Sequence, residues 1–331
     1  MKFVSFEHPA TRAVRFGLVL DDGAIADLQA AYGVMRAVQG GAQPSDDMNA
    51  GALHDALAFI TMGDAGLALA QQVADFLRAV RSGGSSVSAP DGAPIVFSQS
   101  EVALRAPIPQ PRKFIAAGKN FRDHMAEMSG TIPIPRRPVA FAQMSTTIVG
   151  PNTAVPHPPE TKALDYEVEV AVVIGKPAVR VSADAALDHV FGYTIFNDIS
   201  ARDVYREEGR TGIPLLGKNF PGFAPLGPVL VTRDEIGSLP DVRLQLRVNG
   251  ETRQDATLSS MLFNVEQLVA HWSQIGLEPG DIITTGTPSG VAAGRKADET
   301  PWWLKAGDIV EAEVAGIGVL RNIIVAGPDA A

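Results

Sequence analysis

The apolar segments of this chain are short, and most of them alternate with the period of two that is typical of β-strands. From Lys113 onward, only one segment has helical spacing, from about Ser259 to Ile275. The chain has 331 residues, of which 32 are Gly and 24 are Pro, and this share favours many turns. We therefore expect a mainly β fold rather than a helical bundle. The expected strands are Tyr166–Ile174, Phe191–Phe196, Val229–Thr232, Val242–Val248, Asp281–Thr285 and Ile309–Val314.

Residues 1–105 have a different pattern, which predicts a small α+β domain. A β-hairpin is expected around the tight-turn signal Asp21-Asp22-Gly23, and Asp64 is the expected N-cap of a long helix. The segment 82–112 is rich in Ser, Gly and Pro, and we interpret it as a linker with a short strand or two. The remainder, 106–331, would form the larger domain. The apolar patterns that predict the hairpin lie at 14–20 and 24–28, and those that predict two helices lie at 53–60 and 67–80.

The composition excludes several classes of site. The chain has no Cys, so disulfides, thiolate zinc sites, iron–sulfur clusters and cysteine nucleophiles are ruled out, and any metal must be bound by oxygen or imidazole. A net charge of −9 without a long basic run argues against general nucleic-acid binding. No apolar run approaches the roughly 20 residues of a membrane span, and the charged N-terminus does not resemble a signal peptide. We expect a cytoplasmic protein without a nucleic-acid or membrane partner.

The segment from Asp165 to Ile174 carries the clearest chemical signal. In a strand, Glu167 and Glu169 lie on the same face, about 6.6 Å apart along the chain. Both faces of this strand look buried, so the two carboxylates need a cation, a proton or a basic partner. An isolated pair of this kind is more often an exposed, solvated edge. Asp198, at the end of the next buried strand, could complete a set of three oxygen ligands suited to Mg²⁺ or Mn²⁺.

A second group of polar residues could act on a substrate. If a short helix begins near Asn120, His124 and Glu127 lie on one face, where the carboxylate would orient the imidazole as a general base. A surface ion pair is the plainer alternative. Lys218 and Arg202 could neutralise an anionic substrate or a developing oxyanion, although each is more often a surface charge when seen alone.

Six segments resemble the fumarylacetoacetate hydrolase family in their order and spacing, over roughly residues 112–325. The resemblance implies a mixed β-sandwich or β-roll catalytic domain with peripheral helices, usually assembled as a homodimer. The first 105 residues would match the variable N-terminal domain of longer members. The segments are GKNFRDHMAEM (118–128), DYEVEVAVVIGK (165–176), FGYTIFNDISARD (191–203), LLGKNFPGFAPLGP (215–228), LEPGDIITTGTPSGV (277–291) and GIGVLRN (316–322).

The resemblance also implies roles for individual residues. The family's metal ligands correspond to Glu167, Glu169 and Asp198, with Mg²⁺ or Mn²⁺ expected and Ca²⁺ able to replace them in a crystal. Its mobile dyad corresponds to His124 and Glu127. The catalytic Lys corresponds to Lys218, and the substrate-binding positions correspond to Arg202, Tyr205 and Thr287.

Three positions depart from the usual family pattern. Tyr205 stands where many members have Gln, which leaves one oxyanion contact open. Pro221 stands where many have Asp, and Gln143 stands where a Lys is common. None of the three is an expected metal ligand, so we expect them to affect which substrate fits.

The activity that the resemblance first implies is hydrolysis of a carbon–carbon bond in an acylpyruvate or other 1,3-diketo acid, such as fumarylacetoacetate or fumarylpyruvate. The dyad would activate water, and the metal would stabilise the enolate. The main alternative is an isomerase, decarboxylase or hydratase acting on 2-hydroxymuconate-type acids or oxaloacetate in aromatic catabolism. A non-catalytic scaffold stabilised by metal is a third interpretation. In the first two, the partner is a small oxo-carboxylic acid.

Overall fold

The computed structural model describes residues 1–40, 51–83, 87–128, 134–296 and 299–327. Its largest sheet has twelve strands in the order β4-β3-β2-β1-β14-β12-β11-β17-β6-β7, with β5 beside β1 and β8 beside β14. The strands are β1 (Lys2–Glu7), β2 (Val14–Val19), β3 (Ile25–Asp27), β4 (Val96–Phe97), β5 (Ala103–Arg105), β6 (Phe114–Gly118), β7 (Val139–Ala142), β8 (Ile148–Val149), β11 (Val168–Ile174), β12 (Val190–Asn197), β14 (Ala224–Thr232) and β17 (Ile282–Thr284).

A second sheet of five strands, in the order β16-β15-β18-β19-β9, packs against the middle of the first. Alternate residues of β11 determine this packing: Val170 and Val172 face the core between the two sheets, whereas Ala171 and Val173 face a separate core toward the N-terminal helices. Both faces of β11 are therefore buried, as the sequence predicts. The second sheet contains β9 (Ala154–His157), β15 (Arg243–Val248), β16 (Glu251–Thr257), β18 (Ile309–Val314) and β19 (Gly318–Ala326), and a two-stranded ladder joins β10 (Leu164–Asp165) to β13 (Ser200–Ala201).

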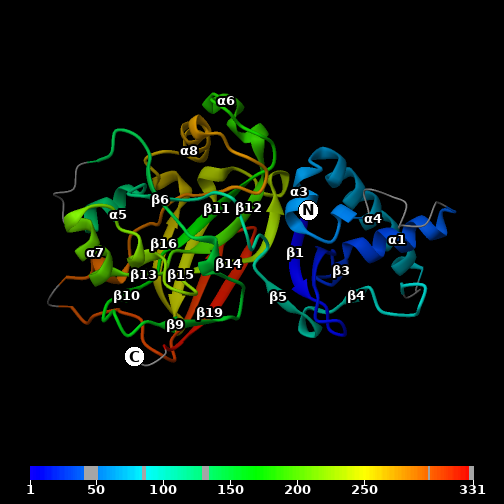
Figure 1. The fold of residues 1–331 in the computed structure, drawn as a ribbon, viewed down its shortest axis with the longest axis horizontal. Coiled ribbons are helices and arrows are strands. Elements are labelled where there is room, and N and C mark those ends of the chain that lie inside the picture. The colour runs from blue at the N-terminus through cyan, green and yellow to red at the C-terminus, as the bar shows by residue number, and fades with distance from the viewer. Residues whose placement is uncertain (41–50, 84–86, 129–133, 297–298, 328–331) are drawn as a thin grey trace.

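Short helices surround these sheets (Figure 1). Those of the N-terminal segment lie at one end of the molecule, and α5 and α7 lie at the opposite end. The helices are α1 (Leu28–Val38), α3 (Ala56–Thr61), α4 (Asp64–Ser82), α5 (Arg122–Glu127), α6 (Ala183–Ala186), α7 (Arg202–Thr211) and α8 (Val265–Trp272). None of the helices in the described ranges combines the length and the hydropathy that spanning a bilayer requires. The expected mainly β, α+β class is confirmed.

The N-terminal segment is joined to the rest of the chain through the main sheet. Strand β1 pairs antiparallel with β14, with Phe3 opposite Leu230. The ring of Phe59 from α3 lies 4.9 Å from Phe3 and 6.1 Å from Phe191 of β12, measured between centroids. One apolar core thus includes side chains from both predicted domains. The division at residue 105 stays a prediction, because a shared sheet does not test independent folding.

Several local predictions are confirmed. The N-terminal hairpin forms with Val19 opposite Ile25. Asn249 and Gly250 both have positive φ, 52° and 81°, as the sequence Asn-Gly favours and as a type I′ turn between β15 and β16 requires. The predicted linker contains β4 and β5, although its residues 84–86 lie outside the described ranges.

Two helix predictions differ from the structure, and one helix was not predicted. The N-cap of α4 is Gly63, and Asp64 is instead the first residue inside the helix. The helix expected from Ser259 to Ile275 is shorter, because the side chain of Asn264 caps it at the N-terminus and Gln267 completes a capping box. Separate 3₁₀ turns flank it at Leu258–Ser260 and Ser273–Ile275. Helix α1 was not predicted; Asp27 caps it directly after β3.

Candidate active site

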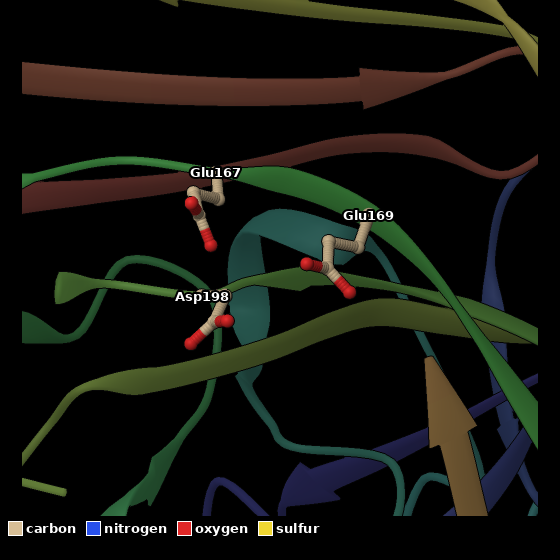
Figure 2. A group of neighbouring side chains, drawn as sticks. All are labelled: Glu167, Glu169 and Asp198. Carbon is tan, nitrogen blue, oxygen red and sulfur yellow. The ribbon is translucent and has the colours of Figure 1, made fainter. Parts of the chain in front are cut away.

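The register between β11 and β12 brings three carboxylates together. Val168 lies opposite Asn197, so the chain segments that carry Glu167 and Asp198 meet just beyond the paired strands. Asp198 N donates to Glu167 O at 2.9 Å, and Glu167 N donates to Asn197 Oδ1 at 3.0 Å. Figure 2 shows the side chains of Glu167, Glu169 and Asp198 directed toward one another. One carboxylate oxygen from each lies within 4.8 Å of the others.

Two buried cations lie beside these carboxylates. Lys218 Nζ is 2.7 Å from Glu167 Oε2 and 2.6 Å from Asp198 Oδ2. Arg202, the first residue of α7, donates through Nη2 to Glu167 Oε1 and through Nε to Asp165 Oδ2 at 2.8 Å. Because Lys218 and Arg202 are both buried, these ion pairs are shielded from bulk solvent.

The surroundings of each carboxylate move its pKa in a different direction. Burial, followed by the neighbouring charges of Asp198 and Glu167, raises the pKa of Glu169 well above its ordinary value. Burial likewise raises the pKa of Asp198 to about 7, against the opposing charge of Lys218. Burial also disfavours the charge of Glu167, but Arg202 and then Lys218 hold its pKa well below the ordinary range. The three carboxylates therefore form one electrostatically coupled group.

The chemistry of this group fits a divalent metal ion. Within the described residues, Asp198 Oδ1 is buried and has no hydrogen-bond partner. The four acidic groups of the cluster, including Asp165, share only the positive charges of Arg202 and Lys218. A dication would compensate the remaining negative charge, and an all-oxygen set suits a hard cation. The buried Glu-Glu-Asp triad could thus hold a divalent metal ion.

The predicted His–Glu contact is present on α5. His124 Nδ1 lies 2.7 Å from Glu127 Oε1, so Nε2 is the ring nitrogen available to a substrate. The other oxygen of Glu127 accepts from Gly290 N at 2.9 Å, and Asp123 Oδ2 accepts from Ser289 Oγ at 2.8 Å. Helix α5 is thereby held against the loop that follows β17. The catalytic role of the dyad stays a prediction.

Several side chains that were expected to bind substrate or to affect its fit make contacts within the protein. The hydroxyl of Thr287 donates to Val168 O at 3.0 Å and accepts from Gln254 Nε2 at 2.9 Å, so substrate contact through this atom would require a change of partners. Tyr205 presents its ring 5.8 Å from Lys218 Nζ. Gln143 is buried and donates to Lys218 O at 3.0 Å, whereas Pro221 is exposed. The effect of these three departures on specificity stays a prediction.

Some residues of the site were not singled out by the sequence. Asp165 is fully buried and bonds Arg202, and Glu208 of α7 accepts the backbone N–H groups of Leu215, Leu216 and Gly217. Glu208 thereby fixes the turn that presents Lys218. A carboxylate directly before an expected buried strand, here Tyr166–Ile174, is a signal that could have identified Asp165. No local pattern indicates Glu208, because its partners lie beyond the end of its own helix.

Comparisons with known proteins agree with this geometry. The family model described as fumarylacetoacetate (FAA) hydrolase C-terminal matches residues 113–325. The chain is 39% identical over 311 residues to oxaloacetate tautomerase YisK of Bacillus subtilis, covering 93% of this chain and 95% of that protein. It is 43% identical over 232 residues to the mitochondrial oxaloacetate tautomerase FAHD2A of Bos taurus, covering 70% and 72% of the two chains.

Two solved structures have the same fold over nearly the whole length. One is the fumarylacetoacetate hydrolase EaFAH of Exiguobacterium antarcticum, with 33% identity, a TM-score of 0.71, and coverage of 98% of this chain and 99% of that one. The other is described as 5-carboxymethyl-2-hydroxymuconate delta-isomerase from Mycobacterium smegmatis, with 29% identity, a TM-score of 0.67, and coverage of 99% and 100%. The likeness therefore includes the N-terminal segment as well as the region that carries the site.

Proposed function

The chain belongs to the fumarylacetoacetate hydrolase family and is an enzyme of that superfamily, and from this premise we propose that it interconverts the keto and enol forms of a small 2-oxo dicarboxylic acid, with oxaloacetate as the first candidate. The observation that carries the proposal is the contact between His124 and Glu127, which lies near enough to the buried triad for the charge of His124 to help lower the pKa of Glu167. The two relatives named as oxaloacetate tautomerases favour this isomerase-type alternative over the carbon–carbon hydrolysis that the sequence first suggested.

A divalent cation held by Glu167, Glu169 and Asp198, with Mg²⁺ or Mn²⁺ preferred by this ligand set, would supply Lewis acidity toward the C1 carboxylate and the C2 oxygen of the acid. His124 Nε2 takes a proton from C3 of the keto form, while Glu127 stabilises the charge that develops on the imidazole. The electron pair released from the C3–H bond forms a C2–C3 double bond. The π pair of the C2 carbonyl moves to its oxygen, which takes up the proton carried by His124, so the net change is one proton moved from carbon to oxygen, and no water is consumed.

The basic residues act on the anionic substrate. Lys218 pairs with Glu167 and Asp198, and its ammonium group would also stabilise negative charge on the C2 oxygen. Arg202 holds Glu167 in place, so its effect on the substrate passes through that carboxylate. Because water is not a reactant, the dyad needs only to exchange a proton with C3.

The test is a comparison of reactions in the presence of Mg²⁺. NMR would follow oxaloacetate, an acylpyruvate and a 2-hydroxymuconate-type acid, each with wild-type protein and with Glu167→Ala. We expect faster keto–enol exchange of oxaloacetate, no cleavage of the acylpyruvate, and loss of both metal and activity in the variant. Hydrolysis of the acylpyruvate without tautomerisation would overturn the proposal, and so would full metal content and activity in Glu167→Ala.

We also propose that the chain assembles as a homodimer, as the family resemblance implies. Met144, Leu215 and Leu216 are exposed by 42%, 42% and 49%, and they gather around Asn219, which bonds Met144 N and Leu215 O. A partner subunit could cover this apolar surface. Light scattering after size-exclusion chromatography measures the mass, and a monomer at micromolar concentration would contradict the proposal. A cytoplasmic location stays a prediction from the sequence.

A further inference from the structure

Asp165 is a buried carboxylate that accepts four hydrogen bonds and lies outside the group of three proposed metal ligands. It lies in β10, its side chain is 0% exposed, and it is not part of the Glu167, Glu169 and Asp198 group. Its Oδ1 accepts from Tyr166 N at 2.9 Å and from Ala292 N at 2.7 Å. Its Oδ2 accepts from Ala293 N at 3.1 Å and from Arg202 Nε at 2.8 Å. Both oxygens therefore bond the N–H groups of one distant loop.

That loop is the surface against which the dyad helix packs. Ala292 begins a 3₁₀ turn that ends at Gly294. Gly290, two residues earlier, donates its N–H to Glu127 Oε2 at 2.9 Å. A Cβ added at Gly294 would overlap the carboxylate of Glu127, so the backbone of Gly294 is in direct contact with that side chain. The position of the turn consequently determines where Glu127, and with it His124, is held.

The same carboxylate is connected to the metal-ligating group. Arg202 donates to Asp165 through Nε and to Glu167 through Nη2. One rigid guanidinium therefore fixes the distance between a proposed metal ligand and the carboxylate that anchors the loop. The path from Glu167 to His124 consists of consecutive contacts through Arg202, Asp165, the turn at Ala292 and Glu127.

We propose that Asp165 is a positioning residue that, together with Arg202, couples the proposed metal ligand Glu167 to the docking of the His124–Glu127 dyad. Arg202 divides its hydrogen bonds between Asp165 and Glu167. When Glu167 gives up its negative charge to a cation, its attraction for Arg202 weakens, and the guanidinium is held more strongly by Asp165. The loop is then held more firmly, and so is α5. The proposal rests on the proposed function for its metal site and for its kinetic consequence.

Both oxygens of Asp165 accept hydrogen bonds, so replacing the carboxylate by the amide of Asn tests these bonds directly. In Asp165→Asn, whichever way the amide is turned, its NH₂ group faces two N–H donors and can bond neither. The residue keeps its size, so the change removes hydrogen bonds without creating a cavity.

Asp281 provides a matched control. It is also 0% exposed and bonded to N–H groups, because Oδ1 accepts from Lys113 N and Oδ2 accepts from both Lys113 Nζ and Glu278 N. It lies by the end of β11 remote from Glu167, where Ile174 N donates to Asp281 O. Asp281→Asn therefore imposes a similar hydrogen-bond loss on the same sheet, away from the dyad.

The experiment measures backbone hydrogen exchange of the full chain by mass spectrometry, with EDTA and then with Mg²⁺ alone. In Asp165→Asn, we expect exchange in peptides covering 122–127 and 288–294 to be about tenfold faster, whereas Asp281→Asn leaves both unchanged. In wild type, Mg²⁺ slows exchange in these peptides, and in Asp165→Asn this response is lost. Mn²⁺ binding measured by calorimetry should keep one site in Asp165→Asn, since no ligand is removed.

The proposal would be overturned if these peptides exchanged at the wild-type rate in Asp165→Asn. It would also be overturned if Asp281→Asn accelerated their exchange as much as Asp165→Asn does. If Asp165→Asn does not fold, Arg202→Lys takes its place, because an ammonium group lacks the rigid planar fork through which the guanidinium bonds both carboxylates; unchanged exchange at 122–127 in that variant would be equally decisive. On oxaloacetate, kcat should fall about tenfold with KM within about threefold. If wild type does not act on oxaloacetate, the proposed function fails, and the exchange measurements still test the role of Asp165.

Discussion

Residues 1–105 and the rest of the chain share one β-sheet, but they bury polar groups of different kinds. In the described part of the N-terminal segment, the buried polar side chains are Ser5, Glu7 and Asp27. Asp27 caps α1, Ser5 bonds Pro107 O, and Glu7 pairs with two arginines at the surface. Each of these groups therefore makes a helix cap, a hydrogen bond or an ion pair that supports the fold.

The catalytic segment instead buries a compact cluster of charges. Asp165, Glu167, Glu169 and Asp198 lie with Arg202 and Lys218 in a site that is almost inaccessible to water. Burying so many charges costs free energy that apolar residues of the same volume would not cost. We infer from this difference that the buried polar groups of the N-terminal segment serve stability, whereas the buried charges of the cluster serve the proposed chemistry. Substitutions in the two regions should therefore separate activity from stability.

The largest effect is expected from Glu169→Gln, which should lower activity while it raises the stability of the metal-free protein. Metal affinity should fall at least about 100-fold and activity at least about 1000-fold, because a proposed metal ligand is lost. Stability of the metal-free protein should rise by about 1 kcal/mol, because a buried carboxyl beside two others is replaced by a neutral isostere. Calorimetry with Mn²⁺ and thermal unfolding in EDTA would measure both. A lower unfolding temperature of the metal-free variant would contradict this account.

Phe59→Ala in the N-terminal core should have the opposite effect, because it should lower stability and leave activity nearly unchanged. Phe59 is fully buried against Phe3 and Phe191, so truncation should cost about 3–5 kcal/mol of unfolding free energy. The kcat/KM of the folded fraction should stay within about twofold. Urea unfolding and steady-state kinetics would test this. Phe76→Ala is the control: this side chain is only partly buried in the same core, and it should cost clearly less.

His124→Ala should affect catalysis alone. Loss of the proton-transfer group is expected to lower kcat about 100-fold, with Mn²⁺ affinity within about threefold and the unfolding temperature unchanged. Steady-state kinetics and calorimetry would measure these quantities. His54→Ala, at an exposed position in the N-terminal segment, is the control and should retain full kcat. A silent His124→Ala would instead favour the non-catalytic scaffold.

Gly294→Ala should have the smallest effect. The new methyl group meets the flexible end of Glu127, which can move, so the fold should be unaffected while the dyad is displaced. We expect kcat to fall about tenfold without a change in unfolding temperature. Gly237→Ala is the matched control, because a Cβ there meets nothing within 4 Å. Equal kinetics for the two variants would show that the position of Glu127 does not limit the reaction.

The sequence predicts those parts of the molecule that depend on short-range pattern. Alternation in the expected strand Tyr166–Ile174 predicts that Glu167 and Glu169 share one face, and the Asp-Asp-Gly turn predicts the first hairpin. Spacing along α5 predicts the contact between His124 and Glu127. In each of these cases, the relevant neighbours lie within a few residues or within one hairpin.

Long-range contacts could not be predicted in this way. The pairing of β1 with β14 joins segments more than 200 residues apart, and no local period specifies which strands become neighbours. The sequence likewise places Lys218 and Arg202 near an anionic substrate, whereas the structure bonds both to the acidic cluster. The hydroxyl of Thr287 is bonded within the protein because Gln254 approaches from a different sheet. Tertiary partners, rather than residue type, determine what each polar group contacts.

The β1–β14 pairing also limits how this enzyme can be divided. If the chain were cut after residue 105, the part of β14 around Leu230 would lose its antiparallel neighbour and present unpaired N–H and C=O groups. The apolar side chains now covered by Phe3 and Phe59 would be exposed beside that open edge. Such a fragment would retain every residue of the candidate site and yet be prone to self-association. We therefore expect the N-terminal segment to protect the sheet that carries the candidate site against aggregation.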